Sequence, residues 1–273
     1  MEVGVMVQVE SAQSGPLYGF EAELVVTADG PVRVVLLNRP DDLNGVNRPM
    51  HQALARVWDH LGADPDARAV VITGAGSAFS AGGDFGYMQE NIDDEVLRAQ
   101  TIEEARSIIR GMVNCPLPVI AAVNGPAVGL GCSIALLSDF LVMGKSSYLA
   151  DPHVAVGLVA GDGGAAMLPL LIGLMKAKEY VMLGDRITPE EAEKLNLVTK
   201  VAADDAVLDD ALAIGERLAA LPPQALRCTK VAMNMHLSRA ALGILEYALA
   251  EEYTSFSTPE FQERVAAFRA KKK

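Results

Sequence analysis

Apolar residues in the first part of the chain fall into short runs separated by polar and glycine-rich stretches. The runs Ala22 to Ala28 and Val32 to Leu37 surround Asp29-Gly30-Pro31, a sequence typical of a turn, and predict a β-hairpin. Residues 47–61 predict a helix, because an asparagine occupies the capping position and a proline stands within the first turn.

Three further apolar runs predict buried strands at Ala69–Thr73, Val119–Val123 and Phe140–Met143. Helix-compatible stretches separate them, at about Asp93 to Val113 and at Gly131 to Ser138. This alternation of strands and helices favours an α/β fold in which helices cover a sheet.

Strand patterns nearly vanish beyond about Gly163, and helical patterns replace them. These patterns cover Ala165–Leu174, Lys176–Leu183, Pro189–Leu195, Asp205–Ala220, Gln224–Ala241 and Pro259–Ala270. We therefore divide the chain into an N-terminal arm at 1–20, whose composition is compatible with disorder, an α/β core with the active site at 21–205, and a helical region at 206–273.

Composition narrows the classes of function. The 273 residues carry a formal net charge of −12, which argues against a nucleic-acid-binding protein, since those usually present a basic patch. No apolar stretch reaches the ~18 residues that span a membrane, and no secretory signal pattern opens the chain. Three cysteines without metal-like spacing fit free thiols in a reducing compartment, so we expect a cytoplasmic protein with no metal site.

The most informative local pattern is a pair of glycine-rich turns. Residues 77–84 (Ser-Ala-Phe-Ser-Ala-Gly-Gly-Asp) follow one predicted strand, and residues 124–133 (Asn-Gly-Pro-Ala-Val-Gly-Leu-Gly-Cys-Ser) follow the next. Glycines allow a ligand to approach the backbone N–H groups closely, and a helix that starts at such a turn adds its positive dipole end. Two turns that face one point would form an oxyanion hole.

Together with Leu37-Asn38-Arg39-Pro40-Asp41-Asp42-Leu43-Asn44 and the closing segment 263–271, these turns resemble the crotonase (enoyl-CoA hydratase/isomerase) superfamily. The resemblance runs from about Glu21 to the C-terminus. It implies a spiral of ββα units with a helical C-terminal trimerisation region, assembled as a trimer or as a pair of trimers. It also implies an acyl-CoA substrate in fatty acid metabolism, with coenzyme A present as part of the substrate and no tightly bound cofactor.

The resemblance also assigns residues. It places the two oxyanion-hole amides on Gly83 and Leu130, where only the backbone N–H is needed. Four further positions are expected to contact coenzyme A: Arg39, Leu43, Ala81 and Lys271.

The chain departs from the superfamily at its acid/base positions. Typical hydratases hold a water molecule between two glutamates, whereas here the matching positions are Ser133 and His153. A two-glutamate hydration therefore cannot operate in its usual form. His153 has an ordinary pKa near 6.5, suited to a general base, and Asp162 follows nine residues later in Gly161-Asp162-Gly163.

This spacing resembles the branch of the superfamily that hydrolyses carbon–carbon bonds in cyclic β-diketones. We therefore predict His153 as the base and Asp162 as its orienting partner or a second acid/base, with Ser133 and Gly161 lining the site. The alternatives are that Asp162 caps a helix, that His153 is structural, and that Ser133 only fills space. The remaining histidines are expected to be surface or packing residues: His51, His60 and His236.

Three functions remain open. The first is an acyl-CoA hydratase or isomerase that stabilises an enolate. The second is a hydrolase of a β-diketone or thioester that uses the histidine and the aspartate. The third is a catalytically silent coenzyme A-binding or scaffold protein, which the absence of both glutamates suggests and the retained glycine turns disfavour.

Overall fold

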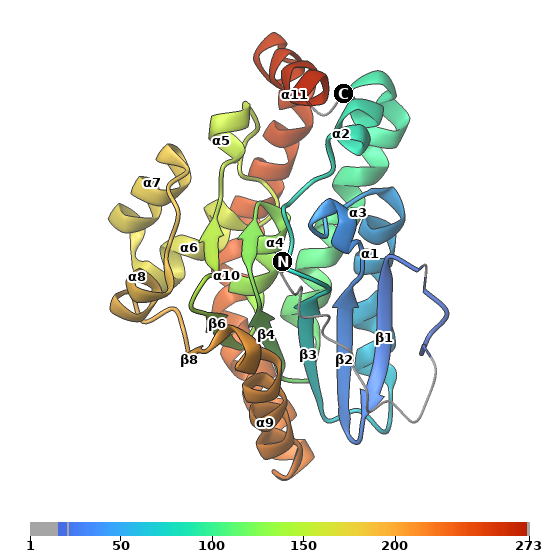
Figure 1. Ribbon diagram of the computed structural model, residues 1–273, viewed down its shortest axis with the longest axis vertical. Coiled ribbons are helices and arrows are strands. Elements are labelled where there is room, and N and C mark those ends of the chain that lie inside the picture. Colours follow the sequence, from blue (N-terminus) through green and yellow to red (C-terminus); the bar gives the residue numbers. More distant parts are fainter. Residues whose placement is uncertain (1–15, 21, 272–273) are drawn as a thin grey trace, which may run out of the picture.

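A mixed β-sheet forms the centre of the protein. The computed structural model describes residues 16–20 and 22–271, so most of the predicted N-terminal arm, residues 1–15, lies outside the described residues (Figure 1). Six strands follow one another in the order β1-β2-β3-β4-β6-β8. They are β1 (Leu24–Asp29), β2 (Val32–Leu37), β3 (Ala69–Gly74), β4 (Val119–Val123), β6 (Phe140–Gly144) and β8 (Lys200–Ala202). The predicted hairpin is the antiparallel pair β1–β2, and the other pairs are parallel.

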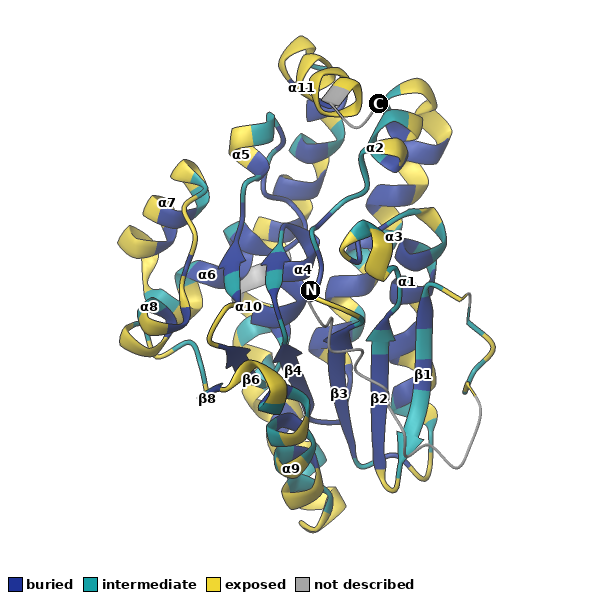
Figure 2. Cartoon of the chain, viewed as in Figure 1, coloured by how far each residue is buried: buried dark blue, intermediate teal, exposed yellow. Residues whose placement is uncertain are grey.

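Helices cover both faces of this sheet, as strand alternation requires. Val70 and Ile72 of β3 point into the larger core, which includes residues of α1 (Arg48–Ala63) and α3 (Glu95–Asn114). Val71 points to the opposite face, where it packs in a smaller cluster with residues of α9 (Val207–Ala219). Because both faces are covered, the central strands β3 and β4 are buried throughout (Figure 2).

The remaining described elements are a second, smaller sheet, further helices and two 3₁₀ turns. A second, two-stranded sheet pairs β5 (Pro126–Val128) with β7 (Tyr148–Ala150). The other helices are α2 (Phe85–Asp93), α4 (Leu130–Leu137), α5 (His153–Val156), α6 (Gly164–Ile172), α7 (Leu174–Leu183), α8 (Pro189–Lys194), α10 (Pro223–Ser255) and α11 (Pro259–Lys271). Two single 3₁₀ turns cover Pro40–Asp42 and Asp204–Ala206.

The predicted fold class is confirmed, and the differences are local. β8 is a strand in the region predicted to be helical, because its three residues pair with the edge of β6. α10 does not end at Ala241 but continues through Gly243 to Ser255. The buried side chains of Leu245 and Leu249 anchor this extension, and their burial outweighs the cost of about 1 kcal/mol for a glycine inside a helix.

Within residues 16–20 and 22–271, no helix combines the length and apolar character that crossing a bilayer requires.

Candidate active site

The two glycine-rich turns lie against each other at the carboxyl ends of β3 and β4. The Ser80 amide donates to the carbonyl oxygen of Pro126 (3.0 Å), and the Val128 amide donates to that of Ser80 (2.9 Å). Gly82 has a φ of +86°, and a β-carbon there would meet the Val128 carbonyl oxygen at 2.9 Å. Gly129, with a φ of +53°, lies beside Gly82. The contact therefore requires glycine on both sides.

Gly83 and Leu130, the two predicted oxyanion residues, line one cavity. Among the described residues, neither amide has a hydrogen-bond acceptor. Leu130 is the first residue of α4, so its N–H also lies at the positive end of that helix. The structure thus brings the two amides to one cavity with their donors unused, and their role as anion donors stays a prediction.

Residues from six helices line the cavity, together with residues of the connecting loops. α2 and α3 supply six of these residues. The lining residues are Val46, His51, Gly83, Tyr87, Met88, Asn91, Thr101, Ile102, Ala105, Leu130, His153, Leu158, Asp162, Glu252 and Phe256. The cavity is therefore mainly apolar, with a few polar groups that converge on it, as is common for ligand sites.

His153 begins α5 and lies between two carboxylates. Its Nδ1 is 2.5 Å from Oδ1 of Asp151, and its Nε2 is 3.3 Å from Oδ2 of Asp162. All three side chains are buried. Only Asp162 was predicted as the partner of the histidine, but Asp151 makes the shorter contact with the ring.

Asp162 is fixed from a second direction by Ser133 of α4. The Ser133 hydroxyl donates to Oδ1 of Asp162 over 2.9 Å. Asp162 does not cap α6, because the capping position belongs to Gly163 and has no side-chain hydrogen bond. Both alternatives from the sequence, a capping Asp162 and a space-filling Ser133, are therefore wrong.

The buried charges shift each other's pKa values. Burial alone lowers the pKa of His153, but the negative charges of Asp162 and Asp151 outweigh it and raise that pKa well above its usual value. Burial raises the pKa of Asp162, yet the His153 charge and the hydrogen bonds from His153 and Ser133 lower it overall. Both shifts favour the charged pair, with His153 as an imidazolium and Asp162 as a carboxylate.

Glu252 of α10 is the second carboxyl group that lines the cavity, and it was not predicted from the sequence. It is buried, and its Oε2 has no hydrogen-bond partner among the described residues. Burial and the negative charges of Asp162 and Asp151 raise its pKa to about 8, despite the opposing charge of His153. Gly161 makes room for it, since a β-carbon there would lie 2.3 Å from Oε2. Glu252 is accordingly a neutral acid at pH 7.

A second buried histidine lines the opposite part of the cavity. Nδ1 of His51 lies 2.8 Å from Oε2 of Glu104, and the hydroxyl groups of Tyr87 and Thr101 lie 2.6 Å apart nearby. His51 is 5% exposed. The surface alternative is therefore wrong, whereas the packing alternative agrees with this burial, and the residue also lines the cavity.

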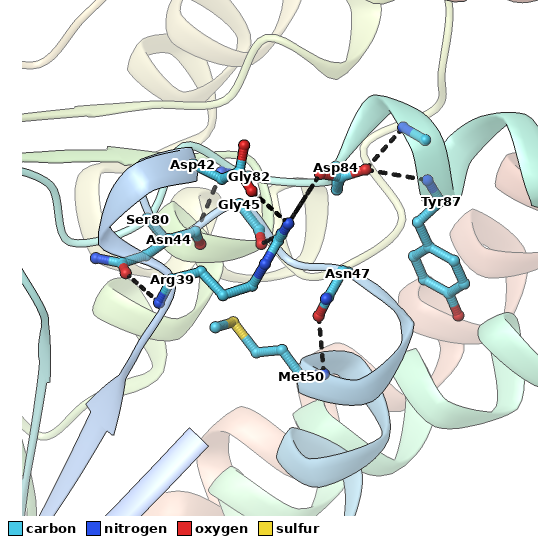
Figure 3. A network of polar contacts seen from close by, with 11 residues as sticks. Arg39, Asp42, Asn44, Gly45, Asn47, Met50, Ser80, Gly82, Asp84 and Tyr87 are labelled. Atoms are coloured by element: carbon cyan, nitrogen blue, oxygen red, sulfur yellow. Dashed lines mark hydrogen bonds and ion pairs between the residues drawn. The ribbon is translucent and has the colours of Figure 1, made fainter. Parts of the chain in front are cut away.

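Arg39, expected to contact coenzyme A, is occupied by neighbouring groups (Figure 3). Its guanidinium lies 2.7 Å from Oδ2 of Asp42 and 3.4 Å from Oδ2 of Asp84, and it also donates to the carbonyl oxygen of Gly45. Asp84 in turn caps α2 through the amides of Gly86 and Tyr87. Arg39 thus joins the loop after β2 to the start of α2.

The other three expected coenzyme A contacts lie in different parts of the fold. Leu43 is 48% exposed and follows the turn Pro40–Asp42, Ala81 is half-buried in the first glycine turn, and Lys271 ends α11. Contact of these residues with coenzyme A stays a prediction. Within the described part of the chain, no group of histidine, cysteine and acidic residues is arranged to hold a metal ion.

Comparison with known proteins places this site in a family. The family model "Enoyl-CoA hydratase/isomerase" matches residues 27–273. A probable enoyl-CoA hydratase of Rhizobium meliloti is 31% identical over 250 residues, which are 92% of this chain and 96% of the relative. A 2,3-dehydroadipyl-CoA hydratase of Escherichia coli is 31% identical over 92% of this chain and 97% of its own length.

A solved structure agrees with both. The crystal structure of an enoyl-CoA hydratase/isomerase from Mycobacterium paratuberculosis superimposes with a TM-score of 0.90 and 52% sequence identity, covering 92% of this chain and all of the other. The chain therefore belongs to the enoyl-CoA hydratase/isomerase family.

Proposed function

We propose that the protein is an acyl-CoA hydratase or isomerase that stabilises an enolate between the Gly83 and Leu130 amides. One observation supports this most directly. A single cavity contains two unused backbone donors, an ionised carboxylate at Asp162 and a neutral carboxylic acid at Glu252. A hydration needs those three elements: a place for negative charge, a proton acceptor and a proton donor.

The proposed hydration uses each group once. The oxygen of a water molecule forms a bond to the β-carbon of the enoyl thioester, while its proton goes to the His153–Asp162 pair. The electron pair of the double bond moves onto the thioester oxygen, which the two amides stabilise. Collapse of this enolate places a proton from Glu252 on the α-carbon, and the proton held by the pair then restores Glu252. The sum is addition of one water across the double bond.

The same groups account for the missing family glutamates. Ser133 stands at one glutamate position but orients Asp162, and His153 stands at the other but pairs with two aspartates. Two carboxyl groups thus still reach the cavity, from the loop before α6 and from α10. Isomerisation needs the same enolate and the same proton transfers without the attack of water.

Turnover of crotonyl-CoA by the purified protein tests the proposal. Hydration is followed by loss of the enoyl thioester absorbance, and exchange of the α-protons of butyryl-CoA in D₂O is followed by NMR. Hydration or exchange that His153→Ala abolishes supports the proposal. Neither reaction on a panel of acyl-CoA esters, with coenzyme A esters still bound, would instead support the silent binding protein.

A second candidate is hydrolysis of a carbon–carbon bond in a cyclic β-diketone. The ion pairs of Arg39 favour it, because they engage a cation that was expected to meet the phosphates of coenzyme A. In this reaction the water oxygen bonds to one carbonyl carbon and the water gives a proton to the His153–Asp162 pair. The bond to the central carbon then breaks, and its electron pair forms an enolate at the second carbonyl. Glu252 protonates the central carbon, and the proton held by the pair restores Glu252. Ring opening of 1,3-cyclohexanedione, measured beside crotonyl-CoA, separates the two candidates.

We further propose that the chain assembles as a homotrimer or a pair of trimers. Large apolar side chains are exposed along α6, α7 and α10, and Figure 2 shows how much of α7 faces outward. They include Leu171, Leu174, Met175, Met182, Leu183 and Met233. Exposed apolar surface of this extent is typical of a protein–protein contact. Light scattering after size-exclusion chromatography tests this, and a monomer at micromolar concentration would contradict it.

A further inference from the structure

The His153 ring has a carboxylate at each of its nitrogens. Asp151 approaches Nδ1 at 2.5 Å, and Asp162 approaches Nε2 at 3.3 Å. Ionised carboxylates only accept hydrogen bonds, whereas a neutral imidazole has one donor and one acceptor nitrogen. A neutral ring would therefore leave one nitrogen lone pair facing a carboxylate. Both contacts are satisfied together only when both nitrogens carry protons.

Asp151 is fixed firmly enough to impose this state. It is 4% exposed, and the same Oδ1 that meets the ring also accepts from the His153 amide over 3.3 Å. Its Oδ2 lies against Gly164, where a β-carbon would come within 1.6 Å. That oxygen has no hydrogen-bond partner among the described residues. The His153 ring is therefore the main group that stabilises the negative charge of Asp151.

We propose that Asp151 is a positioning residue that keeps His153 as an imidazolium, so that Asp162 and not His153 accepts the proton in the reaction. The role of Asp162 rests on the proposed function, whereas the protonation state of the ring does not. The sequence analysis predicted the reverse assignment, with the histidine as base.

The other groups around the ring agree with this assignment. α10 contributes Glu252, which is neutral at pH 7, and α4 contributes Cys132, whose thiol pKa burial raises well above its usual value. α1 contributes His51, itself paired with Glu104. Asp151 and Asp162 are thus the anions next to His153, and both stabilise its charged form.

Asp162 retains the capacity to act as the base. Its Oδ1 accepts from Ser133, its Oδ2 faces the His153 ring, and the residue lines the cavity. A carboxylate oxygen accepts more than one hydrogen bond, so Oδ2 can take a water proton while the ring keeps both of its own. Bond formation between the water oxygen and the substrate carbon then accompanies transfer of one proton to Oδ2.

The protonation of the ring can be measured without substrate. Protein labelled with ¹⁵N-histidine is titrated by NMR from pH 6 to pH 9, and His153→Gln identifies the His153 signals among the four histidines. We expect both ring nitrogens of His153 to remain protonated at pH 8 in the wild type. In Asp151→Asn, one of them should lose its proton below pH 8. A neutral His153 ring in the wild type at pH 7 overturns the proposal.

A second readout separates positioning from a purely structural role. The dependence of kcat on pH is compared for the wild type, Asp151→Asn and the exposed control Asp204→Asn, on whichever of crotonyl-CoA or 1,3-cyclohexanedione is turned over. If the imidazolium is required, Asp151→Asn shifts the alkaline limb of the profile to lower pH, by at least one pH unit, with little change in KM. If the neutral ring is the base, the acid limb shifts to lower pH instead, and the proposal is wrong.

The two readouts fail separately. Absence of turnover on both substrates contradicts the proposed function and leaves the NMR result to decide the ring state. If Asp151→Asn does not fold, the wild-type titration decides it alone.

Discussion

Asp162 and Glu252 are both buried carboxyl groups of one cavity, yet the protein treats them in opposite ways. Asp162 accepts from Ser133 and faces an imidazolium, which lowers its pKa. Glu252 receives no hydrogen bond at Oε2 and feels the charges of two aspartates, which together with burial raise its pKa to about 8. Neighbouring groups, and not depth of burial, therefore decide which of the two is ionised.

The difference gives a division of labour. A carboxylate and a carboxylic acid that face the same substrate can accept and donate a proton in one cycle. The contrast depends on His153, because it forms an ion pair with Asp162, whereas Oε2 of Glu252 has no hydrogen-bond partner among the described residues. Substitutions around that cation should consequently abolish the contrast or reveal its size.

Removal of the cation should have the largest effect. In His153→Ala, Asp162 loses its charged partner and becomes more like Glu252, so we expect activity on crotonyl-CoA to fall by roughly 10²–10⁴-fold. His236→Ala, in an exposed part of α10, is the matched control and should retain full activity. A His153→Ala protein that keeps more than half of the activity contradicts the assignment.

Distortion of the proposed anion site between the two glycine turns should have the second-largest effect on activity. Gly82→Ala places a β-carbon 2.9 Å from the Val128 carbonyl oxygen and moves the Gly83 amide, so we expect a loss of about 10²–10³-fold in kcat. Gly30→Ala is the control, because Gly30 also has a positive φ (+54°) but no atom within 4 Å of an added β-carbon. Equal activity of the two variants, with equal circular dichroism, would show that this turn does not stabilise the transition state.

Removal of the Ser133 hydroxyl should have a smaller effect. Ser133→Ala deletes one hydrogen bond to the Asp162 carboxylate, worth about 1.5–3 kcal/mol, and leaves the imidazolium in place. We expect a loss of roughly tenfold in kcat together with a rise of the acid limb of the pH profile. A loss as large as that of His153→Ala would mean that the hydroxyl, not the cation, keeps Asp162 ionised.

The smallest expected effect is on stability, and it isolates Glu252. Its pKa is about 8 in the folded protein and near 4.5 in the unfolded chain, so its contribution is fully present below pH 4.5 and is lost as pH rises toward 8. His153 acts in the same direction, since its pKa is also raised. We expect Tm to fall between pH 5 and pH 8 in both proteins. The fall should be roughly 5 °C smaller in Glu252→Gln than in the wild type. An identical slope for both proteins would mean that Glu252 is ionised.

The glycine turns and the strands before them could be predicted from local signals. The strands at Ala69 and Val119 and the turns after them have short-range patterns, and parallel strands bring their carboxyl ends to one edge. Six of the fifteen residues that line the cavity lie within residues 85–113. α2 within that segment was not predicted, because its mixed composition shows no clear helical stripe and its start depends on the capping of Asp84.

The acid/base groups could be predicted only in part. His153 was identified by its match to a family glutamate position and Asp162 by its spacing from His153, whereas no sequence pattern singled out Asp151, which the fold places at Nδ1. Glu252 comes from a helix about ninety residues farther along the chain. Its one local signal is that it continues the buried stripe of Leu245, Ala248 and Leu249 at helical spacing. An acidic residue on such a stripe is worth attention in any sequence.

The two glycine turns also bear on how such a site can diverge. Their mutual contact consists of backbone hydrogen bonds at Ser80, and their donors are backbone amides at Gly83 and Leu130. A site built from backbone groups requires few specific residues other than the glycines at the point of contact. The surrounding side chains can then be exchanged one by one while the proposed anion site is inherited unchanged. New acid/base groups can evolve beside it, because its backbone donors do not depend on the identity of a side chain.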